Sequence, residues 1–506
     1  MHPVLAIIII VAVCLYALLQ TILYLTQSER EPPVLESSIP FMDFALGILK
    51  HRAGYMAQLR RKHGASIHTL RVPFQRLYVV HTPSLIQTIQ SKANAATFVP
   101  NLLDFGMLFS GLNSRSQAIL GKSFSKRNAF TMSVHKYLLS GPSLAAVTST
   151  ALDKLSSSLP NTLTGDGKRG LMELVRHELT MALTGAIYGP ENPYDDIHIE
   201  ASWYEFVPGI SHLLYSPFPY FTARKAMQAR ARIINAFRKY FETGGHLQAF
   251  PMIPEMYEAN NSRGLAPSES AKMEMATSLA MLSSGANTTF WVLYHIFSNP
   301  SALQDIREEL LAVSKTDCTE VRPVCRTIDL SLVKTECPTL VAILNETLRF
   351  HSSVINIKQV QHDTTLADEY LLKKNGIVMI PGQSIHHDKE IWGSRADAFD
   401  HLRFLDPQSK RNLSTTSAFR PFGAGATMCP GRHFSTNVIL GLVAMVVVQY
   451  DFSPVEGQWK APTTRNADIW NAMPKPDRDL MITISRRHDD NDADWKFVWT
   501  AKVERT

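Results

Sequence analysis

This sequence contains few cysteines, and basic residues only slightly outnumber acidic ones. Its 506 residues include five cysteines, at positions 14, 318, 325, 337 and 429, with no CxxC pair. This pattern argues against a secreted disulfide scaffold and favours a reducing compartment. The 51 basic and 45 acidic residues give a net charge of +6 and are scattered along the chain. Because basic residues form only short runs, nucleic-acid binding is not indicated.

The sequence also lacks internal repeats, low-complexity tracts and a second linker that would mark a domain boundary. Hydrophobic residues make up 45% of the chain, enough to bury a large core. We therefore expect one catalytic domain at 46–487 and a polar C-terminal tail at 488–506. Helical spacing of apolar residues predicts helices near 268–298, 338–350 and 434–450, whereas IHTLRV and LYVV predict a strand pair. The expected fold class is mainly α with a smaller β part.

The N-terminal segment is a long apolar run. Residues 4–25 carry no charge and are long enough to cross a bilayer, so 1–28 is predicted to be a membrane anchor. A signal peptide would have a shorter apolar region, a basic start and a small-residue cleavage site. Basic residues follow the segment, which places the body on the cytosolic side. Residues 29–45, rich in proline, are predicted to be a stiff linker.

The motif AFRPFGAGATMCPGRHFS contains the most informative cysteine. It places Phe422, Gly423, Gly425, Cys429 and Gly431 at fixed offsets just before an apolar helix. A thiolate that ligates haem iron needs a rigid loop with closely approaching backbone N–H groups, and glycines permit such a loop. The start of a helix also stabilises negative charge. Taken alone, Cys429 could equally be a buried, inert cysteine in a glycine-rich turn.

The spacing of this motif resembles the haem-ligand signature of the cytochrome P450 superfamily: Phe, Gly three residues on, Cys four further, and Gly two later. The resemblance implies the P450 fold, a single large helical domain with peripheral β-sheets after one transmembrane helix. It also implies haem (iron-protoporphyrin IX) with Cys429 as its axial thiolate and metal ligand. NADPH–cytochrome P450 reductase would deliver electrons from NADPH, with cytochrome b5 as a further partner. The implied location is the endoplasmic reticulum membrane, with a single pass and a cytosolic catalytic domain.

A second motif lies in ILNETLRF, where Glu346 and Arg349 stand three residues apart on a predicted helix. Such a pair is commonly a surface ion pair. The resemblance implies instead that the two side chains are buried beneath the haem and joined by Arg403. Removal of one member would then leave a buried charge uncompensated and impair haem incorporation.

A third motif, SSGANTT, interrupts the apolar run near 283–289. Thr288 can donate to the Ser284 carbonyl and open the helix locally. Alternatively, the helix merely accommodates small residues at a packing contact. The resemblance assigns oxygen activation to Gly285, Asn287 and Thr288. Asn287 stands where an acid is usual, so proton delivery must run through Thr288 and water. The Ala-Asn-Thr run is similar to that of the sterol 7α- and 12α-hydroxylase and prostacyclin synthase branch.

Two departures concern the haem propionates. No WxxxR motif occurs between residues 110 and 150, and Thr427 stands where arginine or histidine is frequent. Lys358 is the candidate replacement, with a solvated lysine as the alternative. Pocket positions follow from the resemblance alone, and all of them could be plain core. They are Leu282, Ala286, Val354, Ile355, Ala472 and Met473.

These features together predict a membrane-bound haem-thiolate monooxygenase that oxidises a small hydrophobic substrate, such as a sterol, a terpenoid or another polycyclic metabolite, within specialised metabolism. One alternative keeps the haem but uses no dioxygen, as a peroxide isomerase or dehydratase of the prostacyclin synthase type. Another is a non-catalytic membrane haem-binding protein. Four N-x-S/T sequons begin at Asn260, Asn287, Asn345 and Asn412. With a cytosolic body none would be glycosylated.

Overall fold

The structure is a computed structural model of the chain. It describes residues 3–35, 39–100, 109–124, 129–163, 167–216, 218–317, 325–406, 418–425, 428–487 and 494–500. Thr427, Cys318 and the Asn412 sequon lie outside the described residues.

Helices dominate the described chain. Up to residue 242 they are α1 (Pro3–Thr26), α2 (Asp43–His51), α3 (Tyr55–His63), α4 (Pro83–Gln90), α6 (Ser114–Phe124), α7 (Ala129–Leu138), α8 (Gly141–Leu163), α9 (Leu171–Tyr188), α10 (Ile197–Phe206), α11 (Ile210–Tyr215), α12 (Pro219–Thr222) and α13 (Arg224–Glu242). The later helices are α14 (Met252–Ser262), α15 (Pro267–Leu282), α16 (Gly285–Phe297), α17 (Pro300–Val313), α18 (Val333–Glu336), α19 (Pro338–His351), α20 (Gly382–His386), α21 (Lys389–Trp392) and α23 (Arg432–Gln449).

Among the described residues, strands form four small sheets at the edges of this helical body. The strands are β1 (Ile67–Val72), β2 (Gln75–Val80), β3 (Phe98–Pro100), β4 (Arg169–Gly170), β5 (Ser314–Asp317), β6 (Cys325–Asp329), β7 (Ile355–Val360), β8 (Thr364–Leu366), β9 (Tyr370–Leu372), β10 (Ile377–Pro381), β11 (Tyr450–Pro454), β12 (Met481–Arg486) and β13 (Asp494–Val498). The largest sheet has the order β1-β2-β10-β7-β3, and the others are β11-β12-β4, β13-β6-β5 and β8-β9. The predicted strand pair is confirmed, because β1 and β2 are antiparallel with Ile67 opposite Val80.

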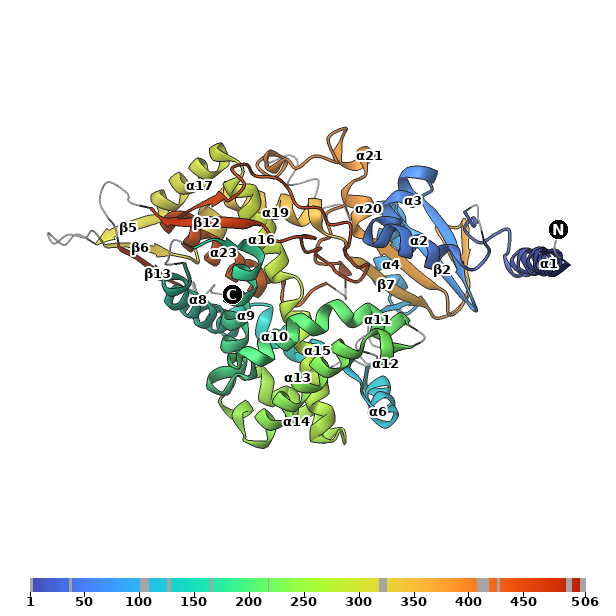
Figure 1. Ribbon diagram of the computed structural model, residues 1–506, viewed down its shortest axis with the longest axis horizontal. Helices are drawn as coiled ribbons and strands as arrows, with labels where there is room; N and C mark the ends of the chain where they lie inside the picture. Colours follow the sequence, from blue (N-terminus) through green and yellow to red (C-terminus); the bar gives the residue numbers. More distant parts are fainter. Residues whose placement is uncertain are drawn as a thin grey trace.

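The core lies among the long helices. Apolar side chains of α8, α9, α13, α16, α19 and α23 form one continuous buried cluster. Helix α16 packs against α9, α19 and α23 at its centre (Figure 1). Two of the predicted helices are confirmed as α19 and α23. Helix α19 starts at Pro338, where the missing N–H of proline costs nothing. Helix α19 contains the Glu346 motif, and α23 follows the cysteine motif directly. The core therefore holds both motifs in place.

Helix α1 projects away from the body beside the largest sheet (Figure 1). By length and composition it could span a membrane from Ile7 to Thr26, and this window is exposed, whereas α23, which is less apolar but also long enough, is mostly buried. Arg71 and Arg76 of the sheet donate to the Thr26 carbonyl at the C-terminal end of α1 (3.4 and 2.6 Å). Cations at this end offset the partial negative charge of the helix dipole. The end of α1 is therefore tied to the sheet.

The termini of the body differ from the boundaries predicted from sequence. Helix α2 begins at Asp43, inside the segment 29–45 that was predicted to be linker. Residues 494–498, within the segment 488–506 that was predicted to be a polar tail, form β13, which pairs in parallel with β6. Trp495 and Phe497 of β13 pack against the main core. This burial of two aromatic rings outweighs the polar character of the surrounding tail.

Glu274 on α15 is a fully buried carboxyl group. It accepts a hydrogen bond from the Tyr188 hydroxyl (3.0 Å), which also contacts Ser278 Oγ (3.1 Å). Burial raises the pKa of Glu274 to about 7, and the Tyr188 hydrogen bond opposes this rise. The side chain is therefore largely protonated below neutral pH, and its O–H is a donor inside the core.

Replacing Glu274 with glutamine is expected to flatten the pH dependence of stability. Because the folded pKa lies above the ordinary value of 4.5, the carboxyl group favours folding at pH below 4.5 and loses this effect as pH rises through about 7. Wild type should lose roughly 3 kcal/mol relative to Glu274→Gln between pH 5 and pH 8. Urea unfolding at both pH values measures the difference, with Glu258→Gln on the exposed face of α14 as control. Parallel pH profiles for wild type and Glu274→Gln would contradict this assignment.

Candidate functional site

Cys429 lies in a tight loop that leads into α23. The Cys429 N–H donates to the Phe422 carbonyl (2.8 Å), and the Gly423 N–H donates to the Arg420 carbonyl (3.0 Å). Gly423 and Gly425 have φ of 77° and 63°, values that other residues rarely adopt, which explains glycine at both positions. Phe422 packs against the main core and anchors the loop.

The surroundings of Cys429 shift the pKa of its thiol in opposite directions. Burial raises the pKa of the thiol, whereas the Gly431 and Arg432 N–H groups and the Arg432 charge lower it. Gly431 is the N-cap of α23, so these N–H groups belong to the unpaired donors at the start of a helix. Arg432 also donates to the Cys429 carbonyl (3.0 Å). The loop thus presents backbone donors to a shielded sulfur, as a thiolate ligand requires.

The long helix predicted over 268–298 is divided at Ser283 and Ser284 into α15 and α16. Thr288 Oγ1 donates to the Ser284 carbonyl (2.9 Å), which confirms the predicted hydrogen bond. Thr289 Oγ1 donates in the same way to the Gly285 carbonyl (3.0 Å). Two such bonds in succession bend a helix, since each hydroxyl competes for a carbonyl of the preceding turn. Gly285 begins α16, and a Cβ there would meet no other atom within 4 Å.

The Asn287 amide binds two backbone carbonyl groups. Its amide Nδ2 donates to the Met473 carbonyl (2.7 Å) and to the Ser283 carbonyl (3.2 Å). The side chain is 8% exposed. Both amide hydrogens are therefore used to hold backbone carbonyls.

Glu346, Arg349 and Arg403 meet in a buried network. Glu346 accepts from Arg349 Nε and Nη2 (2.7 Å each), and both side chains are fully buried. Arg403, on the 3₁₀ helix η7 (His401–Phe404), brings its Nε within 3.4 Å of Glu346 Oε1, an ion-pair distance without hydrogen-bond geometry. The Asp400 N–H also donates to Glu346 Oε1 (2.8 Å).

The remaining donors of this network bind backbone carbonyls. Arg349 Nη1 donates to the carbonyls of His386 and Ala396 (2.6 and 2.9 Å), and Nη2 donates to Ala398 (3.2 Å). Arg403 donates to the carbonyls of Trp392 and Arg395 (3.0 and 2.6 Å). The network therefore joins α19 to the segment 386–403, which has little regular structure of its own.

Lys358 on β7 is buried rather than solvated. It is 6% exposed, and its Nζ lies 3.4 Å from the Phe98 carbonyl. Burial lowers its pKa, and the nearby charge of Arg420 lowers it further. Lys358 and Arg420 are thus two buried cations close to one another.

Arg420 was missed by the sequence analysis. Its side chain is 1% exposed, and its Nη2 donates to Asn356 Oδ1 (2.5 Å). Its Nε and Nη1 are buried without a hydrogen-bond partner, and neither Arg420 nor Lys358 has a carboxylate partner within the described chain. A buried guanidinium without an anion is costly. The only available signal in the sequence was the absence of both usual cationic partners of the haem propionates.

These observations fit a haem group. The thiol of Cys429 is the kind of donor that ligates haem iron, and its loop supplies N–H groups to the sulfur. The orphaned donors of Arg420, beside Lys358, are matched by the two propionate carboxylates that haem carries. The described residues thus contain both an iron donor and a cationic site for the carboxylates.

The predicted pocket residues come from three segments that the structure connects. Ser353, next to Val354, donates its N–H to the Ala472 carbonyl (2.9 Å), and Asn287, next to Ala286, binds the Met473 carbonyl. Leu282, Ala286 and Met473 are buried in the main core, and Ile355 packs against the core of the largest sheet. The contacts bring the predicted positions together, while their role as a substrate pocket stays a prediction.

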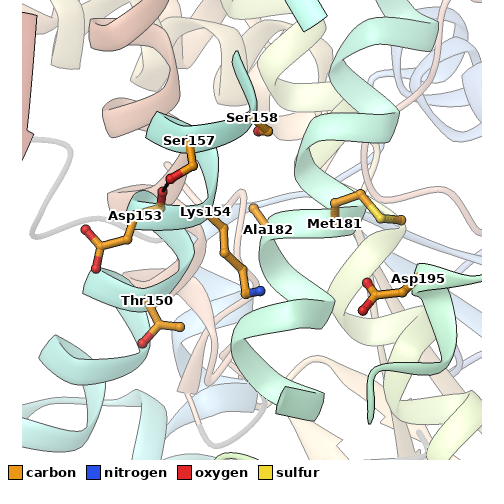
Figure 2. Close-up of a pocket in the computed structure, with 8 residues that line it drawn as sticks. All are labelled: Thr150, Asp153, Lys154, Ser157, Ser158, Met181, Ala182 and Asp195. Atoms are coloured by element: carbon orange, nitrogen blue, oxygen red, sulfur yellow. Dashed lines mark hydrogen bonds between the residues drawn. The ribbon is translucent and has the colours of Figure 1, made fainter. Parts of the chain in front are cut away.

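A separate groove lies between α8 and α9 (Figure 2). It has a volume of about 550 Å³ and is open to solvent. Its lining residues are Thr150, Asp153, Lys154, Ser157, Ser158, Met181, Ala182 and Asp195. None of the predicted site residues lines it, so it is distinct from the site around Cys429.

Comparisons with known proteins agree with the geometry of this site. The family model described as cytochrome P450 matches residues 266–478. The chain is 30% identical over 481 residues to cytochrome P450 monooxygenase nodJ of Hypoxylon pulicicidum, covering 92% of each chain. It is 26% identical to a cytochrome P450 monooxygenase of Gibberella zeae, over 94% of this chain and 92% of the relative. It is 24% identical to the 7-alpha-hydroxycholest-4-en-3-one 12-alpha-hydroxylase of Oryctolagus cuniculus, over 86% and 89%.

Proposed function

Because the chain belongs to the cytochrome P450 family and is a monooxygenase of that family, we propose that it inserts one oxygen atom from dioxygen into a hydrophobic polycyclic substrate. The substrate class is a sterol, a terpenoid or a similar metabolite. The observation that carries the proposal is that the chain has both a shielded Cys429 loop with N–H donors to the sulfur and a helix opened at Thr288. The 12α-hydroxylase among the relatives acts, by its name, on a sterol derivative, which supports this class.

In this proposal the thiolate of Cys429 would ligate the haem iron. When bound, haem supplies the iron at which dioxygen is activated, and an anionic sulfur favours cleavage of the O–O bond. The Gly431 and Arg432 N–H groups stabilise the negative sulfur, and Phe422 with Gly423 and Gly425 keeps the loop rigid. Arg420 and Lys358 hold the propionate carboxylates. Glu346, Arg349 and Arg403 fix the segment 386–403.

Thr288 is the residue that handles a proton. Its hydroxyl hydrogen is donated to the Ser284 carbonyl, and rotation about the Cβ–Oγ1 bond would redirect this hydrogen into the space beside the opened helix. Gly285 keeps that space free of a side chain. Since Asn287 has no ionisable proton and its amide is engaged by carbonyls, protons reach the site through Thr288 and water.

The proposal includes a membrane and a redox partner. Helix α1 would anchor the chain in the endoplasmic reticulum membrane, from which a hydrophobic substrate can enter. Electrons would come from NADPH through a P450 reductase, with cytochrome b5 as a further donor. The family relationship and the exposed, apolar α1 support both parts.

The test is expression with a P450 reductase in microsomes and incubation with a panel of sterols, terpenoids and aromatic polycycles. The expected result is a product that requires NADPH and carries one atom of isotopically labelled dioxygen. Turnover of a lipid hydroperoxide without NADPH or dioxygen would contradict the proposal and favour an isomerase or dehydratase. Haem-loaded protein that neither oxidises nor rearranges any compound would favour a non-catalytic haem-binding protein.

Replacing Asn356 with aspartate is expected to weaken haem retention about tenfold, a change of roughly 1.4 kcal/mol. The new carboxylate lies 2.5 Å from Arg420 Nη2 and competes with the propionate for this cation. Transfer of haem to excess apomyoglobin measures the rate of loss. Asn466→Asp, an exposed asparagine, is the matched control. If Arg420 were only structural, Asn356→Asp would satisfy it and leave haem retention unchanged or improved.

A further inference from the structure

Four successive carbonyl groups, those of Asn471 to Pro474, are held by side chains or backbone of two helices and their flanks. We refer to these four residues as the strap. The Asn471 carbonyl accepts from Ser353 Oγ, and the Ala472 carbonyl accepts from the Ser353 N–H (2.9 Å). The Met473 carbonyl accepts from Asn287 Nδ2 (2.7 Å), and the Pro474 carbonyl accepts from Trp291 Nε1 (2.9 Å). The strap is therefore fastened along its whole length although it has no regular secondary structure.

Asn287 and Trp291 supply two of these four hydrogen bonds. They stand four residues apart on α16, so their side chains project from the same face. Trp291 is 1% exposed, and its ring stacks on His351 with centroids 3.9 Å apart. This stacking fixes the indole, so the Pro474 carbonyl is held at a defined position. The Met473 carbonyl then depends on Asn287 alone among the described donors.

The chemistry of this contact explains asparagine at position 287. An ionised carboxylate there would place an oxygen against the Met473 carbonyl oxygen, and two acceptors repel each other. A carboxyl group could replace the amide only while protonated. The acid that is usual at this position in the family would therefore open the strap, whereas the amide closes it at every pH.

We propose that Asn287 is a positioning residue that clasps the strap to α16 and thereby fixes the side of the substrate pocket formed by Ala472 and Met473. Its part in the reaction is to set pocket shape and substrate selectivity, while the proton passes through Thr288. The inference rests on the proposed function only in taking the space beside α16 as the substrate pocket.

Asn287→Asp on the full-length haem-loaded protein tests the clasp. The probes are imidazole, which needs little space, and clotrimazole, which fills the pocket, and both are followed by difference spectra. Burial places the pKa of the new carboxyl group between about 5 and 8. Across that range we expect the Kd of clotrimazole for Asn287→Asp to rise about tenfold with increasing pH. With each Kd calculated for the neutral azole, so that protonation of the probe itself does not enter, the Kd of imidazole should stay constant, as should both values for wild type.

Neighbouring titratable groups do not obscure this readout. On the helices they are His295 and His351, whose pKa values burial lowers, and beside the strap they are Asp468 and Lys475. Wild type contains all four groups, so any effect of their titration on azole binding will show in the Kd values of wild type. Asn260→Asp, on the half-buried side of α14, controls for an added charge.

A second variant keeps the inference falsifiable if Asn287→Asp does not fold. Trp291→Phe removes the neighbouring donor without adding charge, and it should weaken clotrimazole binding equally at all pH values while sparing imidazole. Clotrimazole binding that is unchanged in Asn287→Asp, or in Trp291→Phe where Asn287→Asp does not fold, would overturn the clasp. So would better coupling of NADPH use to product at neutral pH in Asn287→Asp, because that result assigns proton transfer to position 287. Azole binding needs only haem, so failure of the proposed oxidation would leave this test intact.

Discussion

Replacing Glu346 with glutamine is expected to cost about 3–5 kcal/mol of stability and most of the bound haem, because it leaves two guanidinium groups facing a neutral amide in a buried site. Arg349 and Arg403 both approach this carboxylate, and Glu346 and Arg349 are fully buried. Since whole domains are stable by only about 5–15 kcal/mol, such a loss leaves little margin. Haem content per chain and the urea midpoint measure the two effects.

The matched control is Glu242→Gln. Glu242 pairs with Arg238 one turn away on α13, at 2.7 Å, but both side chains are about half exposed. Exposed pairs contribute at most about 1 kcal/mol, so this variant should retain its haem. Equal stability of Glu346→Gln and Glu242→Gln would show that the buried network contributes no more to stability than an exposed ion pair.

Replacing Cys429 with alanine is expected to abolish oxygen insertion. No other described cysteine lies in the glycine loop that supplies N–H groups to a sulfur, so none can restore the anionic donor. The assay is NADPH-dependent product formation with reductase, together with haem content.

Cys337→Ala is the control for this loss. Cys337 is also buried, but burial raises the pKa of its thiol to about 12, so it stays neutral, and it precedes α19 away from the glycine loop. We expect full turnover in Cys337→Ala with a stability loss of about 1–2 kcal/mol for the small cavity. Product formation by Cys429→Ala at the rate of Cys337→Ala would refute the assignment.

Features that depend on local spacing could be predicted from the sequence. The break before α16 follows from a threonine four residues after Ser284, and the Glu346–Arg349 contact follows from their separation by one helical turn. The start of α19 follows from Pro338. In each case the partners lie within one turn of helix, so the residue types and their spacing determine the contact.

Contacts between distant segments could not be predicted in this way. Asn287 and Met473 are 186 residues apart, and nothing near either residue indicates the other. Strand β13 pairs in parallel with β6, about 170 residues earlier, and its sequence lies among acidic residues that suggest a solvated tail. Arg420 was passed over because one arginine within a loop motif gives no sign of its burial; only the fold places it beside Lys358.

The most direct test of the account is the reduced carbon monoxide difference spectrum of the purified full-length protein. The account predicts the band position that is specific for an iron–thiolate ligand in wild type and in Cys337→Ala, and its loss in Cys429→His. A colourless wild-type protein, or a wild-type band at the position typical of an imidazole ligand, would contradict it.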